Sequence, residues 1–265
     1  MLEMYLLTCF PGGGCILGSP TMMAETSRWL CKTYNATCIA PAYRLAPEHI
    51  FPTALNDAFD SFLWISKNAT YAPISADPSQ GFIIGGVSAG ANMAIVIAHL
   101  ARDQSISPPL TGLYSACGSV RCRNLDDLDP IYRDRHLSRS QQECISNPIL
   151  SPELQDLMSS AYQPDHSSHL FSPLLWPSPD NVANKKGHRN LVPRVYQQIC
   201  GRDPARDEAL IFDDILRQKD SGVGAKMDFY AGVPHCFWIA LRHLPESDRW
   251  ERETIEGFGW LLGKR

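Results

Sequence analysis

The sequence lacks an apolar run of about 20 residues, the length that an α-helix needs to cross a bilayer. Its first residues, MLEMYLLTCFPGGG, have no basic leader, and their short apolar run ends at proline and glycine, so they do not form a secretory signal. Nine cysteines occur without a CxxC pair or zinc-finger spacing, which indicates free thiols in a reducing compartment. We therefore expect a cytoplasmic protein with no membrane span and no metal site.

Charge and composition exclude further classes of protein. The net charge is -4, and no basic run is interleaved with aromatic residues, so we expect no nucleic-acid partner. Hydrophobic residues make up 44% and charged residues 20% of the chain, which is typical of a globular protein. The 265 residues are enough for one large α/β domain, which we expect to span residues 1–265.

Short apolar runs alternate with amphipathic stretches along the chain. Strands are predicted at residues 4–10, 36–45, 81–88, 110–120, 193–200 and 225–232. Helices are predicted at residues 26–34, 52–66, 89–102, 207–218 and 248–262. Because strands and helices alternate, the predicted fold class is α/β, with a mostly parallel central sheet that is flanked by helices.

Residues 121–190 interrupt this alternation between two late strands. The stretch is rich in Asp, Ser, Pro and His, and a loop of that length is unusual in a compact domain unless it forms a lid or an insertion. Some of its apolar residues could form pocket walls, but their helical spacing favours plain core. These residues are Ile149, Leu150, Leu154, Leu157 and Met158.

Gly86-Val87-Ser88-Ala89-Gly90 is a GxSxG motif, the pattern of a nucleophile elbow. The chemistry needs a strand that turns abruptly into a helix with the serine at the apex, and small flanking residues make room for that turn. A strand is predicted before Ser88 and a helix after it, so the dipole of that helix favours negative charge at the serine. Ser88 is the candidate nucleophile; the alternative is a glycine-rich turn between strand and helix.

Three glycines, Gly12, Gly13 and Gly14, follow the first predicted strand. Glycines let the backbone bend so that its N–H groups point at a ligand oxygen, and ester cleavage passes through an oxyanion that needs such donors. A further donor is the N–H of Ala89, which follows the candidate nucleophile. The alternatives are an ordinary tight turn and a phosphate loop, although the Gly-Lys-Ser/Thr of a Walker loop is absent.

A carboxylate and a histidine follow two of the later strands. Asp203 lies just past the strand PRVYQQIC, where a fixed loop can orient an imidazole. Asp207 and Glu208 compete for this role, but they fall in the first turn of the next helix, where acidic residues are common because of the helix dipole. Among eight histidines, only His235 follows a strand and also comes after the candidate serine and aspartate.

These motifs together resemble the hormone-sensitive-lipase-like branch of the α/β-hydrolases, whose catalytic residues occur in the order serine, aspartate, histidine. The resemblance runs from about residue 4 to 262, and the end of the chain is most similar to fungal members, some of which act in secondary metabolism. It also rests on Tyr43-Arg44-Leu45-Ala46-Pro47-Glu48-His49, Phe51-Pro52, Asp57, Ser172-Pro173-Leu174 and Phe237-Trp238.

The resemblance implies an α/β-hydrolase fold with a reduced cap over residues 121–190. It implies hydrolysis of carboxylic esters with short or medium acyl chains, without a metal or cofactor. By the family motif, Gly13 and Gly14 would supply the oxyanion N–H groups, with Gly12 adjacent and Ala89 opposite. The implied catalytic triad is Ser88, Asp203 and His235.

The chain departs from the family pattern at three points. Pro11 stands where the family usually has histidine, and because proline has no N–H and a fixed φ, the glycine loop must be held differently. Val87 stands where an aspartate usually precedes the nucleophile, which removes a hydrogen bond that supports the elbow. Only ten residues precede Pro11, whereas the family normally has several tens, which predicts a truncated chain or a more open acyl site.

The sequence thus predicts a serine hydrolase that cleaves a small or medium-sized carboxylic ester through an acyl-enzyme. One alternative is a ligand-binding pseudoenzyme, since plant hormone receptors that resemble this family have lost the triad histidine. Another is a biosynthetic lyase or cyclase. His235 favours an enzyme. The expected partner is a small-molecule ester, and a homodimer is a further expectation because some relatives dimerise through the final sheet edge.

Overall fold

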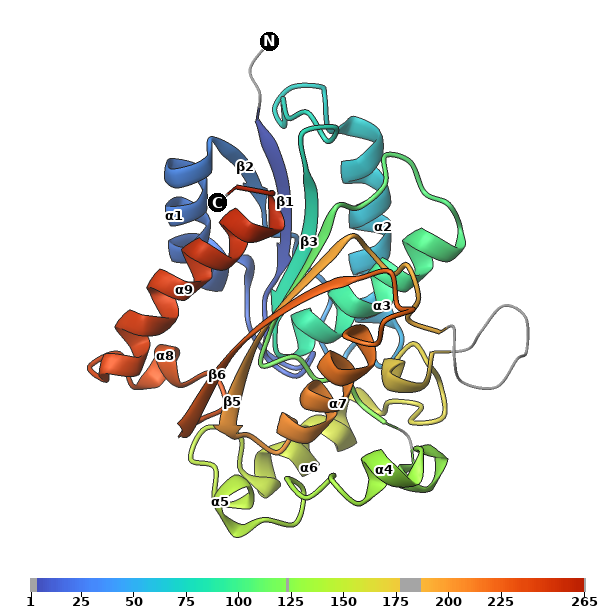
Figure 1. Ribbon diagram of the computed structural model, residues 1–265, viewed down its shortest axis with the longest axis vertical. Coiled ribbons are helices and arrows are strands. Elements are labelled where there is room, and N and C mark those ends of the chain that lie inside the picture. Colours follow the sequence, from blue (N-terminus) through green and yellow to red (C-terminus); the bar gives the residue numbers. More distant parts are fainter. Residues whose placement is uncertain (1–3, 123, 177–186, 265) are drawn as a thin grey trace.

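A six-stranded sheet forms the centre of the computed structural model, which describes residues 4–122, 124–176 and 187–264 (Figure 1). All neighbouring strands are parallel, in the order β2-β1-β3-β4-β5-β6. The predicted α/β class is therefore confirmed. The strands are β1 Tyr5–Phe10, β2 Ala36–Ile39, β3 Phe82–Val87, β4 Gly112–Ala116, β5 Arg194–Arg202 and β6 Gly224–Pro234.

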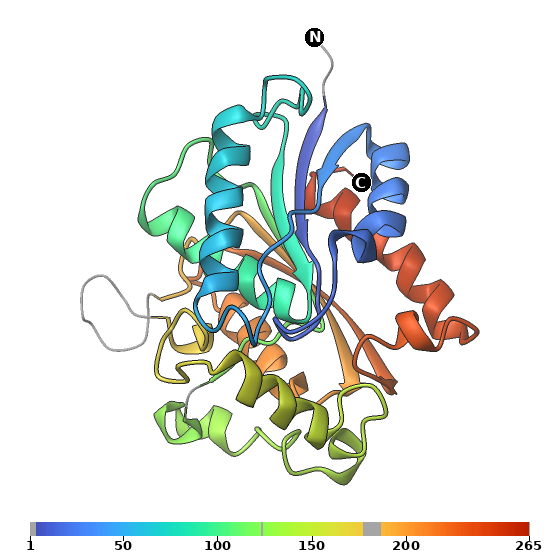
Figure 2. The same cartoon turned by 180° about the vertical axis from the view of Figure 1, so that it is seen from behind.

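Helices cover both faces of the sheet (Figure 2). On one face lie α1 (Ala24–Tyr34) and α9 (Pro245–Leu261). On the other lie α2 (Thr53–Asn68), α3 (Ala89–Asp103) and α7 (Arg206–Leu216). Within the described ranges, no helix is both long and apolar enough to cross a bilayer.

Two hydrophobic cores separate the sheet from these two layers. Leu6 and Leu7 of β1 are both fully buried, but Leu6 packs in the core that contains Phe62 of α2, and Leu7 in the core that contains Phe258 of α9. Successive side chains of a strand point to opposite faces, so a strand that is covered on both sides is apolar throughout. Each fully buried leucine contributes about 1.5–3 kcal/mol to folding. This explains why the strands are continuous apolar runs in the sequence.

The segment between β4 and β5 lies across the edge of the sheet where the strands end (Figure 2). Residues 123 and 177–186 of the predicted insertion lie outside the described residues. Helix α6 begins at Pro152 because the Ser151 hydroxyl accepts a hydrogen bond from Leu154 N at 3.3 Å, and proline suits the first helical position. The elements are η2 Leu125–Asp127, α4 Pro130–Arg133, α5 Gln142–Ile145, α6 Pro152–Tyr162 and η3 Pro173–Leu175.

Some predicted boundaries differ from those of the structure. The strand predicted at residues 36–45 ends at Ile39, because the chain leaves the sheet edge there to reach the glycine loop, where Ala46 N donates to Cys15 O at 2.9 Å. The strand predicted at residues 110–120 is limited to β4. Outside the segment between β4 and β5, two short helices were not predicted, η1 (Pro20–Met23) and α8 (Phe237–Ala240).

Candidate active site

Ser88 lies at a sharp turn between β3 and α3. Its φ of 54° and ψ of -118° are rare for a residue with a side chain and cost about 1–3 kcal/mol. The turn requires glycine on both sides, because a Cβ on Gly86 would clash with Gly90, and a Cβ on Gly90 would clash with the carbonyl of Phe10. Ser88 N also donates to Ala116 O at 2.9 Å, which fixes the turn to β4. The predicted elbow geometry is therefore present.

His235 lies between the serine and an aspartate. Its Nε2 is 2.9 Å from Ser88 Oγ, and its Nδ1 is 2.6 Å from Asp203 Oδ2. His235 follows β6 directly and Asp203 follows β5 directly, so the parallel register of these strands brings both side chains to one edge of the sheet. Ala205 N donates to the other oxygen of Asp203 at 2.9 Å and holds the carboxylate in place. The structure thus brings together the three residues that the sequence singled out.

Burial and charge shift the pKa values of His235 and Asp203 in opposite directions. His235 is 5% exposed and Asp203 is 2% exposed. Burial by itself would lower the pKa of His235, but the Asp203 carboxylate outweighs burial and raises that pKa to about 9. Burial raises the pKa of Asp203, and the contact with His235 offsets only part of that effect. The carboxylate therefore favours the charged form of the imidazole, as acceptance of a proton from Ser88 would require.

The glycine loop lies beside the serine. A Cβ on Gly12 would be 3.2 Å from Ser88 Cβ, so a larger residue there would require the loop or Ser88 to shift slightly. Gly13 and Gly14 have φ values of 120° and 61°, a region that favours glycine. Among the described residues, none accepts a hydrogen bond from the backbone N–H of Gly13, Gly14 or Ala89. Gly14 and Ala89 line the same pocket as Ser88.

Tyr43 holds the glycine loop in place through Pro11, the residue that stands where the family usually has histidine. Its hydroxyl donates to the carbonyl of Pro11 at 2.8 Å. Tyr43 begins the segment that resembles the family, and this segment is itself fixed by Arg44, whose guanidinium makes contacts of 2.8 and 2.7 Å with the two carboxylate oxygens of Asp57. The sequence predicted that this loop must be held differently from the loop of the family. The hydrogen bond from Tyr43 to the Pro11 carbonyl is one contact that holds it.

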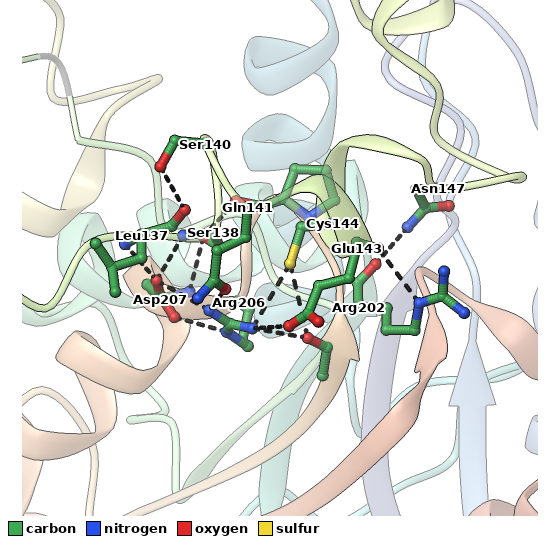
Figure 3. A network of polar contacts seen from close by, with 12 residues as sticks. Leu137, Ser138, Ser140, Gln141, Glu143, Cys144, Asn147, Arg202, Arg206 and Asp207 are labelled. Carbon is green, nitrogen blue, oxygen red and sulfur yellow. Dashed lines mark hydrogen bonds and ion pairs between the residues drawn. The ribbon is translucent and has the colours of Figure 1, made fainter.

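Asp207, which the sequence treated as a competitor for the triad, has a different position. Its Oδ2 accepts from the backbone N–H groups of Leu137 and Ser138 at 2.6 and 2.7 Å, and Arg206 Nε lies 2.7 Å from its Oδ1 (Figure 3). Burial would raise the pKa of Asp207, but Arg206 and the two N–H groups outweigh it and lower that pKa. Asp207 therefore anchors the segment after α4 to the start of α7.

Glu208 anchors the same segment at a second point. Its side chain is 2% exposed and forms an ion pair with Arg139, and it accepts from Cys122 N at 2.9 Å. The sequence explained Asp207 and Glu208 by the helix dipole alone. No local pattern could show these contacts, because the partners lie about 70 to 86 residues earlier in the chain.

Ser88 and His235 open into a pocket under the segment between β4 and β5. Leu150 and Met158 line this pocket, and Leu157 is 56% exposed. None of the five apolar residues predicted as plain core is buried, so that prediction is wrong. For Leu150 and Met158 the reason is that they face the cavity, where Met158 lies beside Gly14, whereas Leu157 faces solvent.

Three buried thiols lie behind the imidazole. Cys117 Sγ is 3.2 Å from Cys200 Sγ and accepts from Cys236 N at 3.3 Å. All nine cysteines are free. Within the described ranges, the one group with metal-ligand proximity is Cys117, His235 and Cys236, whose ligand atoms lie within 4.8 Å of one another. Both ring nitrogens of His235 already face Asp203 and Ser88, so a metal bound there would disrupt that arrangement.

A parallel sheet with a serine elbow, an aspartate and a histidine at its carboxyl edge defines the serine-hydrolase type of α/β fold. Comparison with known families agrees, because a model described as alpha/beta hydrolase fold matches residues 7–239. The chain therefore belongs to the α/β-hydrolase family, in the hormone-sensitive-lipase-like branch that its motifs resemble.

The chain is similar to a protein of the hydrolase superfamily, an esterase and a cyclase. An AB hydrolase superfamily protein of Schizosaccharomyces pombe is 37% identical over 88% of this chain, which spans 64% of that relative. The versiconal hemiacetal acetate esterase of Dothistroma septosporum is 26% identical over 96% of this chain and 72% of its own. Among solved structures, vibralactone cyclase superposes with a TM-score of 0.85 at 32% identity, over 99% of this chain and 72% of its own.

Proposed function

We propose that this protein is a carboxylesterase-type serine hydrolase that acts on small or medium-sized esters. The observation that carries the proposal is the position of His235, with one ring nitrogen at Ser88 Oγ and the other at Asp203. The hydrolase family of the chain and the similarity to a fungal esterase support it.

In the proposed mechanism, Ser88 Oγ attacks the ester carbonyl carbon while His235 Nε2 takes the hydroxyl proton. Asp203 holds the imidazole by its Nδ1 and stabilises the charged ring. The imidazolium then gives its proton to the leaving alcohol, and an acyl-enzyme remains. A water molecule, deprotonated by His235, attacks the acyl group, and the acid leaves as Ser88 regains its proton.

The glycine loop would stabilise the charge that develops on the carbonyl oxygen. The N–H groups of Gly13, Gly14 and Ala89 have no other acceptor among the described residues, and Gly12 lies against Ser88. Each such donor is typically worth about 10²- to 10³-fold in rate. No metal or cofactor enters the proposed reaction.

Within one domain of residues 1–265, we propose that residues 121–190 act as a cap that sets acyl preference. Leu150 supports this role because it lines the pocket from the segment that Asp207 and Glu208 anchor. Leu150→Trp should lower kcat/KM for a p-nitrophenyl octanoate more than for the acetate. An unchanged ratio of the two values would contradict the cap proposal.

The test of the esterase proposal is hydrolysis of p-nitrophenyl acetate, butyrate and octanoate. Ser88→Ala should lower kcat by at least about 10³-fold, because the nucleophile is lost. Ser160→Ala, at an exposed serine of α6, is the control and should retain the wild-type rate. A fluorophosphonate should label wild type at Ser88 and leave Ser88→Ala unlabelled. Equal hydrolysis by both serine variants would place the activity elsewhere.

The similarity to vibralactone cyclase favours a second candidate, a lactone-forming cyclase. Here a hydroxyl within the acyl group would attack the acyl-enzyme in place of water. The new C–O bond forms as the bond to Ser88 breaks, and the hydroxyl proton passes through His235 to Ser88 Oγ. With a p-nitrophenyl ester of a hydroxy acid, mass spectrometry distinguishes lactone from free acid. Lactone above the level formed without enzyme would favour the cyclase, and acid alone the esterase.

A further inference from the structure

Arg121 is a cation of the pocket that the proposed mechanism does not use. It follows β4 and lines the pocket together with Ser88 and His235. Its guanidinium carbon lies 4.8 Å from the ring centre of Phe171, so the aromatic ring supports one face of the group. Among the described residues, none accepts a hydrogen bond from the Arg121 guanidinium or forms an ion pair with it. Its N–H donors are therefore available to a ligand.

The nearby carboxylate does not satisfy Arg121. Glu208 lines the same pocket, but its carboxylate already pairs with Arg139 and accepts from Cys122 N. Glu208 and Asp203 attract the charge of Arg121 from nearby, but neither forms a hydrogen bond or ion pair with its guanidinium among the described residues. His166, also in the lining, does not change this balance, because burial and the two arginines lower the pKa of its imidazole.

The chemistry of the group indicates what it binds. Burial lowers the pKa of Arg121, but a guanidinium remains charged in proteins, and its five N–H donors need hydrogen-bond acceptors. Its planar fork matches the two oxygens of a carboxylate, which it binds with parallel hydrogen bonds. A pocket that contained only an alkyl chain would leave these donors unsatisfied, which disfavours binding.

We propose that Arg121 selects esters that carry a second, ionised carboxylate, in the acyl or in the alcohol part. This inference rests on the proposed esterase function of Ser88 and names its substrate class. The ester carbonyl lies at Ser88 while the free carboxylate binds the Arg121 guanidinium across the same pocket. Arg121 is therefore a specificity residue, which binds substrate without taking part in the proton transfers.

The test compares matched anionic and neutral esters. For the acyl part, these are mono(4-nitrophenyl) glutarate and 4-nitrophenyl pentanoate; for the alcohol part, they are 4-acetoxybenzoate and 4-acetoxybenzamide. In at least one pair, Arg121→Gln should lower the ratio of anionic to neutral kcat/KM by about tenfold or more. Arg135→Gln, at an exposed arginine outside the pocket, is the control and should leave the ratio unchanged. Unchanged ratios in both pairs would overturn the proposal.

Two measurements keep this result separate from folding and from the esterase proposal. In the wild type, glutarate or benzoate should inhibit neutral-ester hydrolysis more strongly than the corresponding amide; equal inhibition would count against the carboxylate site. In the Ser88→Ala background, calorimetric binding of the same carboxylates should disappear when Arg121→Gln is added. If no ester is hydrolysed but this Arg121-dependent binding is observed, the esterase proposal fails and the carboxylate site stands.

Discussion

Replacing Asp203 by asparagine should remove most of the ester hydrolysis while leaving the fold intact. Asp203 Oδ2 lies 2.6 Å from His235 Nδ1, and both side chains are buried, so no water can take the place of the carboxylate. In Asp203→Asn, the amide can present its NH2 group to Nδ1, which moves the imidazole proton to Nε2. Because Nε2 faces Ser88 Oγ, the ring can then no longer accept the hydroxyl proton.

The magnitude follows from the loss of the correct tautomer and of the charge that stabilises the imidazolium. Asparagine at this position of a serine protease triad lowers kcat by about 10⁴-fold. At about 1.36 kcal/mol for each tenfold change, this corresponds to about 5 kcal/mol in the activation free energy. The same carboxylate raises the pKa of His235, so its removal should also lower that pKa and move the acidic limb of the pH–rate profile to lower pH.

The assay is hydrolysis of p-nitrophenyl butyrate between pH 5 and about 10, with circular dichroism and thermal melting as checks on folding. Asp207→Asn is the matched control: it removes a carboxylate only four positions later, whose contacts hold Leu137 and Ser138 and do not reach His235. This control should retain most of the activity. A folded Asp203→Asn protein that keeps more than about a tenth of the wild-type kcat would refute the assignment of Asp203.

Three further predictions concern the site. Wild-type hydrolysis should rise with pH through neutrality, because the neutral form of His235 acts as the base and its pKa is raised to about 9; a rate that is flat from pH 6 to about 9 would contradict this. Tyr43→Phe removes the bond to the Pro11 carbonyl and should lower kcat, with a loss of about 0.5–1.5 kcal/mol in the free energy of urea unfolding. Gly90→Ala should lower that free energy by about 1–3 kcal/mol or more, because the new Cβ clashes with the Phe10 carbonyl; an unchanged midpoint would exclude this tight contact.

Homodimerisation, the cytoplasmic location and the absence of a nucleic-acid partner remain predictions from the sequence. Sedimentation equilibrium with the purified chain would test the dimer.

The strands and helices show where prediction from sequence works. The run FIIGGV and the helix after it were found because a strand covered on both faces is apolar throughout, and because the GxSxG pattern marks the turn between them.

Residues in and just before α6 show where prediction from sequence fails. Helical spacing identifies an apolar side of a helix, but not whether that side meets a packed core or a cavity. Leu150 and Met158 therefore had the sequence pattern of core residues and yet line the pocket. The same limit applies to Arg121, which has no local pattern that distinguishes it from a solvated arginine. Its proposed role depends on the contact with Phe171, about 50 residues later in the chain, and on the pairing of Glu208 with Arg139.

The sequence by itself determined the parallel α/β sheet, the serine elbow, the glycine loop, and the choice of Asp203 and His235. These features depend on short stretches whose backbone and side-chain requirements are local: small residues at a tight turn, and polar residues directly after buried strands. Only the tertiary structure decided that His235 Nε2 and Ser88 Oγ lie 2.9 Å apart across 147 residues of chain, and that Asp207 and Glu208 anchor the segment above the pocket. Such contacts are set by packing between elements distant in sequence, which no local pattern contains.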